Sequence, residues 1–146
     1  MTSNITDSDT DTNRQLIERI FAQLAQGNGR ALVDAMDDDF CWTLTGTSAW
    51  SGTWRGKQAV REQLLAPLFA QFEGLYTNTA ERVIADGEHV AVQCRGRVGT
   101  KAGQRYDNHY CFVFRVVDGR LKEVVEHLDT ALVDAVLQPP PVPPSR

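Results

Sequence analysis

Residues 106–129 read YDNHYCFVFRVVDGRLKEVVEHLD. Aromatic and β-branched residues alternate with polar ones on both sides of Asp118-Gly119, a pattern that is typical of half-buried strands. Asp-Gly between two such runs is a strong signal for a two-residue hairpin turn. The second run also carries ionisable side chains among apolar neighbours. The stretch therefore predicts a hairpin of a curved sheet, with an acid at the mouth of a pocket.

Outward from this hairpin, the chain alternates between helical and strand patterns. Strands are predicted near 40–44, 76–85 and 89–98, with a loop at 47–56. Apolar residues at helical spacing predict helices from Thr12 or Asn13 to Gly27, over about 31–36 and over 57–72. Pro67 should kink or split the last of these. We expect residues 130–137 to form a short helix or an extended segment that leaves the sheet. Helices before a run of antiparallel strands predict an α+β fold.

Length and composition predict one domain, over residues 12–137 of the 146. Residues 1–11 are polar and acidic, and we expect a disordered arm. Residues 138–146 are rich in proline, which lacks an N–H, so we expect a disordered, extended tail. Hydrophobic residues make up 42% of the chain, enough for a substantial core.

The net charge is −4, and the basic residues are scattered, which argues against a nucleic-acid partner. No apolar run approaches the ~20 residues that span a bilayer. The N-terminal residues do not resemble a signal peptide, so we expect a cytoplasmic protein without a membrane partner. Cys41, Cys94 and Cys111 are expected to be free thiols. The sequence has no Cys-x-x-Cys or His-Glu-x-x-His motif, and we expect neither a metal nor a cofactor.

Several short motifs resemble those of the SnoaL-like group. They are Trp42-Thr43-Leu44-Thr45-Gly46, Trp54-Arg55-Gly56, and the pattern from Phe112 through Asp118-Gly119 to Glu126 and Asp129. This group lies within the nuclear transport factor 2-like superfamily, with ketosteroid isomerase relatives, polyketide cyclases and limonene epoxide hydrolase. The resemblance implies a cone-shaped, strongly curved mixed or antiparallel sheet with three helices closing a cavity. It also implies a homodimer that pairs through the outer sheet face, where Cys111, Val113 and Val125 would lie.

Glu126 is the leading catalytic candidate. The cyclases and the epoxide hydrolase place an acid seven residues after the hairpin glycine, and Glu126 occupies that position here. Burial raises a carboxyl pKa toward neutrality, which suits general acid–base catalysis. Alternatives are an ion pair with Arg95 or Arg97, or exposure to solvent. The residues that alternate with Glu126, namely Val124 and Leu128, would line the same cavity.

Strand parity and the resemblance indicate further catalytic and substrate-binding residues. Tyr110, Asn108 or Arg95 would stabilise a developing oxyanion, with Tyr110 and Arg95 as further catalytic candidates. The predicted substrate-binding residues are Trp42, Leu44, Trp54, Asn108, Phe112, Val124 and Leu128. A one-residue error in parity would make His109 the base instead. Asp129, two residues after His127, is another catalytic alternative, although it could simply cap the chain that follows.

Two better-known catalytic sets of the group are incomplete. Gln93-Cys94-Arg95 stands where the epoxide hydrolase has Arg-x-Asp, and no acid lies in 42–45, where ketosteroid isomerase has its base. The leading hypothesis is thus a cofactor-independent isomerase or cyclase acting on a small apolar, cyclic or polyketide-like molecule. The alternatives are a non-catalytic module that binds small ligands and a hydrolase related to the epoxide hydrolase.

Overall fold

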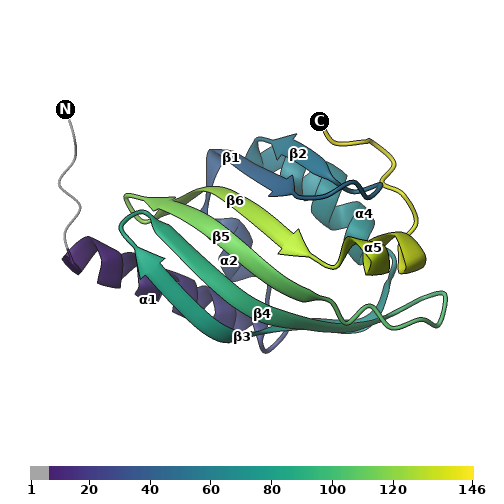
Figure 1. Ribbon diagram of the computed structural model, residues 1–146, viewed down its shortest axis with the longest axis horizontal. Helices are drawn as coiled ribbons and strands as arrows, with labels where there is room; N and C mark the ends of the chain where they lie inside the picture. Colours follow the sequence, from purple (N-terminus) through teal and green to yellow (C-terminus); the bar gives the residue numbers. More distant parts are fainter. Residues whose placement is uncertain (1–6) are drawn as a thin grey trace.

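The computed structural model describes residues 7–146, which form a curved sheet backed by helices (Figure 1). The helical elements are α1 (Asp7–Leu24), α2 (Arg30–Ala35), α3 (Lys57–Ala59), the π-helical η1 (Val60–Leu65), α4 (Ala66–Phe69) and α5 (Thr130–Val136). The strands are β1 (Met36–Leu44), β2 (Gly52–Arg55), β3 (Phe72–Asp86), β4 (His89–Thr100), β5 (His109–Val117) and β6 (Arg120–Leu128).

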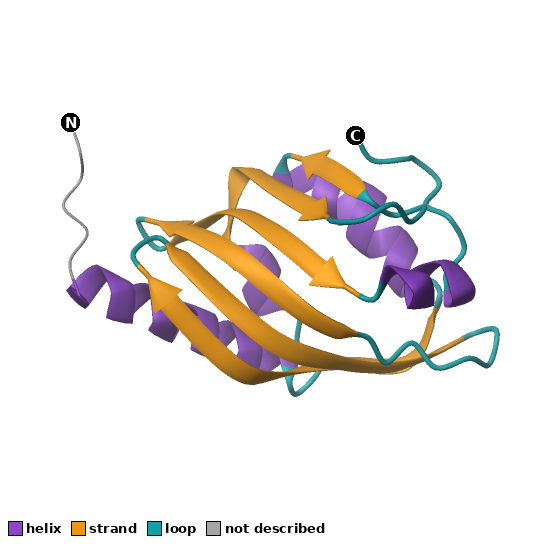
Figure 2. Ribbon diagram, in the orientation of Figure 1, coloured by secondary structure: helices purple, strands orange, loops and turns teal. Residues whose placement is uncertain are grey.

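The six strands form one mixed sheet in the order β2-β1-β6-β5-β4-β3. Neighbouring strands are antiparallel except β1 and β6, which run parallel. Helices α1, α2 and α4 lie behind the same face of the sheet, and α5 lies at one end (Figure 2). The predicted α+β class, with a curved mixed sheet and covering helices, is confirmed. None of the helices in residues 7–146 combines the length and apolarity that crossing a bilayer requires.

The β5–β6 hairpin has the geometry that its sequence predicts. Asp118 and Gly119 both have positive φ, 50° and 73°, as a type I′ turn requires. The turn sets a register in which Phe112 faces Glu126 across the two strands. Alternate residues of β5, beginning with Tyr110, are buried on the concave face. Strand parity, on which the candidate site depends, follows from this hairpin.

The core lies between the concave face of the sheet and the helices. The apolar face of α1, formed by Ile17, Ile20, Phe21 and Leu24, is buried against it. Phe21 contacts Phe112 and Phe114 of β5, with ring centroids 6.3 and 6.1 Å apart. The helix expected over 57–72 is divided into α3, η1 and α4, with Pro67 in the first turn of α4. Proline cannot donate the helical hydrogen bond at this position, which accounts for the irregularity.

The N-terminal boundary differs from expectation. Helix α1 begins at Asp7 rather than at Thr12 or Asn13, so residues 7–11 of the expected arm are helical, and residues 1–6 lie outside the described part. Acidic residues near a helix N-terminus interact favourably with its dipole. The helix is also tied to the β3–β4 turn, because Thr10 Oγ1 accepts from the Gly87 N–H at 3.0 Å and Asn13 Nδ2 donates to the Gly87 carbonyl at 2.8 Å.

The proline-rich C-terminal segment, expected to be a disordered tail, is hydrogen-bonded to the domain at both ends, although most of its residues are exposed. The backbone of Ser145 pairs with that of Thr53, with N–O distances of 2.7 and 3.1 Å, beside the outer edge of β2. The carbonyl of Gln138 accepts from Trp50 Nε1 at 2.8 Å, and its N–H donates to Gln71 Oε1 at 2.8 Å. Proline removes donors only at its own positions, so the non-proline residues at both ends of the segment anchor it.

Candidate active site

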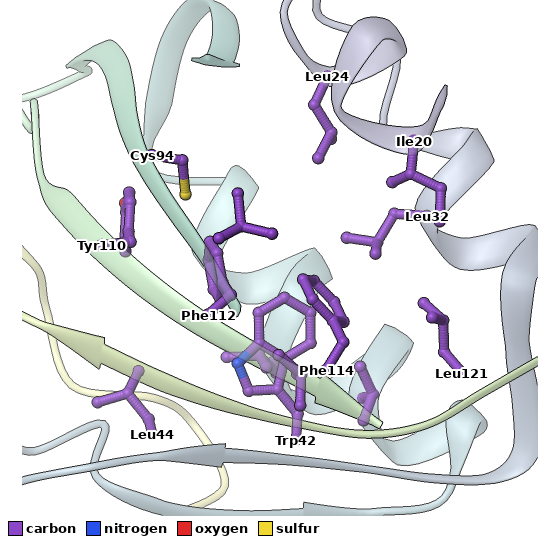
Figure 3. Close-up of a cluster of buried hydrophobic side chains, with 14 of the residues drawn as sticks. Ile20, Leu24, Leu32, Trp42, Leu44, Cys94, Tyr110, Phe112, Phe114 and Leu121 are labelled. Carbon is purple, nitrogen blue, oxygen red and sulfur yellow. The ribbon is translucent and has the colours of Figure 1, made fainter. Parts of the chain in front are cut away.

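The concave face of the sheet and the helices enclose a cavity of about 330 Å³. Figure 3 shows Tyr110, Phe112 and Phe114 of β5 and Trp42 of β1 directed toward Leu24 of α1 and Leu32 of α2. Besides tryptophan, the lining contains only five polar side chains among the described residues: Tyr76, Asn78, Tyr106, Tyr110 and Glu126. The volume lies at the lower end of the range for small-molecule sites, roughly 300–1,000 Å³.

Glu126 is held by backbone pairing on both sides of β6. It faces Phe112 of β5 and Leu44 of β1. Beyond the end of β1, the N–H and Oγ1 of Thr45 both donate to the Glu126 carbonyl, each at 3.0 Å. Two neighbouring strands and this clamp therefore fix the backbone from which the carboxyl side chain projects.

The carboxyl group of Glu126 is buried, with 7% of the residue exposed. Burial disfavours the charged form and raises the pKa of Glu126 to about 7, while a hydrogen bond from Trp42 acts in the opposite direction. That bond runs from Trp42 Nε1 to Glu126 Oε1 at 2.7 Å. Near neutral pH the group is thus divided between its acid and base forms, and it can both accept and return a proton.

A short polar chain lies on β3 and β5. Asn78 Nδ2 donates to the Tyr76 hydroxyl at 3.1 Å, and the Tyr76 hydroxyl lies 3.5 Å from that of Tyr110. Gly96 on the intervening strand β4 makes room for them. A Cβ atom at this glycine would lie 2.9 Å from both Tyr110 Cε2 and the Tyr76 hydroxyl. The absence of a side chain at position 96 therefore permits the two phenols to meet.

The phenols remain neutral hydrogen-bond donors. Burial raises the pKa of Tyr76, Tyr106 and Tyr110 above that of an exposed phenol, and the nearby Glu126 carboxyl raises each of them further. Tyr110 also stacks on Phe112, with centroids 5.1 Å apart. The cavity thus combines one acid of near-neutral pKa with un-ionised hydroxyl groups in an aromatic wall.

The model of the SnoaL-like domain family matches residues 17–124. The chain belongs to the SnoaL-like domain family. It has the fold of the nuclear transport factor 2-like superfamily, as the resemblance implied. A nuclear transport factor 2-like protein from Burkholderia xenovorans LB400 is similar to it, with a TM-score of 0.68 and 21% identity, covering 92% of this chain and 100% of that one.

Two further solved structures share the fold of this SnoaL-like domain. A putative SnoaL-like polyketide cyclase from Jannaschia sp. CCS1 is 22% identical, with a TM-score of 0.72, covering 97% of this chain and 99% of that one. An epoxide hydrolase from M. tuberculosis, described as LEH-like, is 21% identical, with a TM-score of 0.67, covering 89% and 92%. The search of curated proteins gives no match.

Five residues assigned from the sequence line the cavity of the SnoaL-like domain: Trp42, Leu44, Tyr110, Phe112 and Glu126. Other predicted substrate-binding residues do not. Val124 is fully buried beside Trp42 in the sheet, and Leu128 is half-buried beside Tyr110. Trp54 packs on Trp50, with ring centroids 6.3 Å apart. Val124, Leu128 and Trp54 were predicted from strand alternation and the resemblance, but none of the three contributes to the cavity lining.

Asn108 is also buried without lining the cavity. Its Nδ2 donates to the Asp129 carbonyl at 3.1 Å and to the Tyr106 hydroxyl at 3.3 Å, while its Oδ1 accepts from the Asp129 N–H at 3.1 Å. These bonds join the residue before β5 to the end of β6. Asn108 therefore orients Tyr106, which does face the cavity.

Three catalytic candidates, Arg95 and the alternatives His109 and Asp129, lie away from the cavity. Arg95 is exposed on the convex face, because Cys94 beside it occupies the buried position of β4. His109 lies on the convex face too, where its Nε2 is 2.6 Å from Glu81 Oε1. Asp129 caps α5, its Oδ1 accepting from the N–H groups of Ala131 and Leu132 at 3.1 and 3.2 Å. None of the three lines the cavity.

Tyr76, Asn78 and Tyr106 are cavity residues that sequence reasoning missed. Strand β3 has register shifts between Glu73 and Thr77 and between Ala80 and Arg82, so alternation along it is interrupted. Tyr106 precedes β5, yet it keeps the parity of Tyr110, a signal that was available. Within residues 7–146, no three His, Cys, Asp or Glu side chains are grouped so that they could hold a metal ion.

Proposed function

We propose that this protein is an isomerase- or cyclase-type enzyme in which Glu126 transfers protons on a small cyclic or polyketide-like molecule. The observation that carries the proposal is a buried carboxyl group with a pKa of about 7 in a largely apolar cavity. A carboxylate in water is too weak a base to abstract a carbon-bound proton efficiently. Raising its pKa increases its basicity while both protonation states remain populated at cellular pH.

The proposed reaction begins with deprotonated Glu126 removing a proton from a carbon next to a carbonyl group. The electron pair of the C–H bond moves into the carbonyl, which gives an enolate, and Glu126 becomes a neutral acid. The acid then returns the proton to another carbon of the ligand. In ring closure, the enolate carbon instead attacks a second carbonyl group of the ligand, a C–C bond forms as the C=O π bond breaks, and the acid protonates the resulting alkoxide oxygen. The hydrogen bond from Trp42 to Oε1 leaves Oε2 as the oxygen for proton transfer.

The enolate oxygen needs a donor, and Tyr110 is the proposed one. Its pKa is raised, so the phenol retains its proton next to a developing negative charge. Tyr76 and Asn78 are positioning residues in this scheme, because they contact the Tyr110 hydroxyl directly or through one another. A preorganised donor in a water-poor site stabilises an oxyanion more than the same group in water.

The lining also suggests the part of the ligand that enters the cavity. Among the described lining residues there is no Lys, Arg or His, so an anionic ring system would remain uncompensated inside. The aromatic wall of Trp42, Phe112 and Phe114 suits flat or cyclic bodies. A similar protein is described as a putative SnoaL-like polyketide cyclase, which is consistent with this substrate class.

Proton abstraction can be tested before the natural substrate is known. We would follow exchange of α-hydrogens for deuterium in cyclic ketones such as 2-tetralone by NMR. Wild-type protein should accelerate exchange, and Glu126→Gln should lose at least about 100-fold of that acceleration. Glu123→Gln is the matched control, because Glu123 lies on the same strand but is exposed. Equal exchange in wild type and Glu126→Gln would reject the assigned role.

A non-catalytic binding module is the second candidate. Two observations favour it. Glu126 is the single carboxyl residue in the described lining, and the other candidate catalytic side chains Arg95 and His109 lie outside the cavity. The first observation also disfavours a hydrolase that needs two acids. Ligand titration followed by tryptophan fluorescence separates the candidates, because Trp42 and Trp50 line the cavity. Binding of cyclic ketones without exchange would support the module.

We further propose that the protein forms a homodimer through the convex face. Cys111, Val113 and Val125 are only partly buried there, and Val113 lies opposite Val125 in the β5–β6 register. Pairing two such faces would remove this apolar surface from water. Light scattering should give twice the chain mass for wild type and the single-chain mass for Val113→Lys. A single-chain mass for wild type at micromolar concentration would contradict the proposal.

A further inference from the structure

The cavity reaches the surface between α2 and α4. Most of its lining is buried, but Gly29 before α2 and Ala66 and Phe69 of α4 are exposed, Phe69 to 44%. These residues lie on two separate elements that flank the opening. A ligand held inside the cavity would therefore have one end near the solvent at this position.

A second depression adjoins the opening. It has a volume of about 290 Å³ and shares Gly29 and Val33 with the lining of the main cavity. Its remaining lining residues are all charged: Arg30, Asp34, Lys57 and Arg61. The chemistry thus changes at Gly29 and Val33, from an apolar interior to an ionic exterior.

The charge of this depression is opposite to that of the whole chain. Three cations and one carboxylate give a local charge of +2, whereas the chain carries −4. Arg30 comes from α2, while Lys57 and Arg61 come from α3 and η1, so the cations converge from two sides. Within residues 7–146, none of the three forms an ion pair with a carboxylate. They are available to a ligand.

We propose that this depression binds an oxyanion, a carboxylate or phosphate, at one end of an amphipathic ligand whose uncharged body occupies the cavity. The inference rests on the proposed function only in that the cavity holds a ligand, and it is independent of proton transfer by Glu126. Guanidinium groups can bind such oxyanions through paired N–H donors. The arrangement would select anionic amphiphiles and orient them, with the anion outside and the reactive ring inside.

Two fluorescent probes test the proposal, because they share one body and differ in one group. 8-Anilinonaphthalene-1-sulfonate carries an anion that N-phenyl-1-naphthylamine lacks. The mouth variant combines Arg30→Gln, Lys57→Gln and Arg61→Gln. The control variant combines Arg19→Gln, Arg82→Gln and Lys101→Gln, which removes the same three charges from exposed positions elsewhere. Both variants thus have the same net charge.

We expect the mouth variant to bind the sulfonate about tenfold more weakly than wild type, and the neutral probe equally well. The control variant should bind both probes as wild type does, and added salt should reduce the difference between the variants. Equal sulfonate affinity in the two variants would overturn the anion site alone. Failure of wild type to bind the neutral probe would overturn the cavity as a ligand site, and this inference with it.

Discussion

The two faces of the sheet carry similar residue types in different surroundings. On the concave face, Glu126 lies in an apolar cavity with Trp42 as its hydrogen-bond partner. On the convex face, the carboxylate of Glu81 lies 2.6 Å from His109, and both side chains are about half exposed, to 48% and 56%. The concave carboxyl has its pKa raised to about 7 by burial. The comparison teaches that the environment, rather than residue type, distinguishes a candidate catalytic acid from a hydrogen-bonded surface carboxylate.

The largest expected difference between the faces concerns packing. Phe114 is buried to 1% exposure and contacts Phe21 and Phe112, whereas its neighbour Val113 is on the convex face and only partly buried. Phe114→Ala should lower the free energy of unfolding by about 3–5 kcal/mol. Val113→Ala should cost less than about 1 kcal/mol when both proteins are measured at a concentration low enough to keep them monomeric. Urea denaturation measures both, and similar losses would contradict the assigned faces.

The second difference is in the pH dependence of stability. The folded-state pKa of Glu126 is raised from 4.5 to about 7, so its neutral form is the one that folding favours. Its contribution is fully present below about pH 4.5 and is lost as pH rises through about 7, a change of about 3 kcal/mol. The stability of Glu126→Gln relative to wild type should therefore increase by this amount across that window.

Urea denaturation at several pH values measures this change, because other groups titrate alike in both proteins. Glu123→Gln provides the control from the opposite face, because Glu123 is exposed on the same strand. A constant difference between Glu126→Gln and wild type at all pH values would show that the folded-state pKa is ordinary.

A third difference concerns two glycines of β4. A Cβ at Gly96 would be 2.9 Å from Tyr110 and Tyr76, while one at Gly99 would be no closer than 3.5 Å to any atom. Gly96→Ala should cost about 1–3 kcal/mol and separate the two phenols. Gly99→Ala serves as the matched control and should be close to neutral. Denaturation gives the cost, and tyrosine hydroxyl resonances in NMR would report the separation; unchanged resonances would refute the contact.

The smallest effect is expected at the convex ion pair. Replacing His109 with Gln removes one partner of an exposed pair, which typically contributes no more than about 1 kcal/mol. α-Hydrogen exchange by the variant should match wild type, because His109 lies outside the cavity. A loss of exchange as large as that of Glu126→Gln would reverse the assignment of the two faces.

Sequence reasoning was accurate where alternation was regular. Along β5 and β6 the hairpin turn sets the register, and alternation then places Tyr110, Phe112 and Glu126 on the concave face. The same rule applied to β4 would have placed Arg95 outside, since Val90, Val92 and Cys94 are buried. Arg95 was instead assigned from the chemistry that an oxyanion requires. Geometry was the better guide at that position.

Other features depend on contacts that no local pattern reveals. Tyr76 lies within the first register shift of β3, between Glu73 and Thr77, and Asn78 lies just after it, so regular alternation does not place them. The edge strand β2 resembles a loop, because Gly52 and the preceding serines are turn residues. The strand predicted near 40–44 begins earlier than expected, because β1 starts at Met36 and includes the acidic residues 37–39. In each case pairing with a neighbouring strand, rather than local propensity, accounts for the assignment of the strand as a whole.

The position of Ser145 beside β2 has a practical consequence for handling the protein. An unpaired outer strand offers its N–H and carbonyl groups to any passing chain, and pairing between such strands is a common route to aggregation. Here Ser145 occupies those groups at Thr53, and Arg146 Nη2 donates to the Ser48 carbonyl at 3.0 Å. An affinity tag fused after Arg146 would disturb this cover and could make the preparation precipitate, so a tag belongs at the other end.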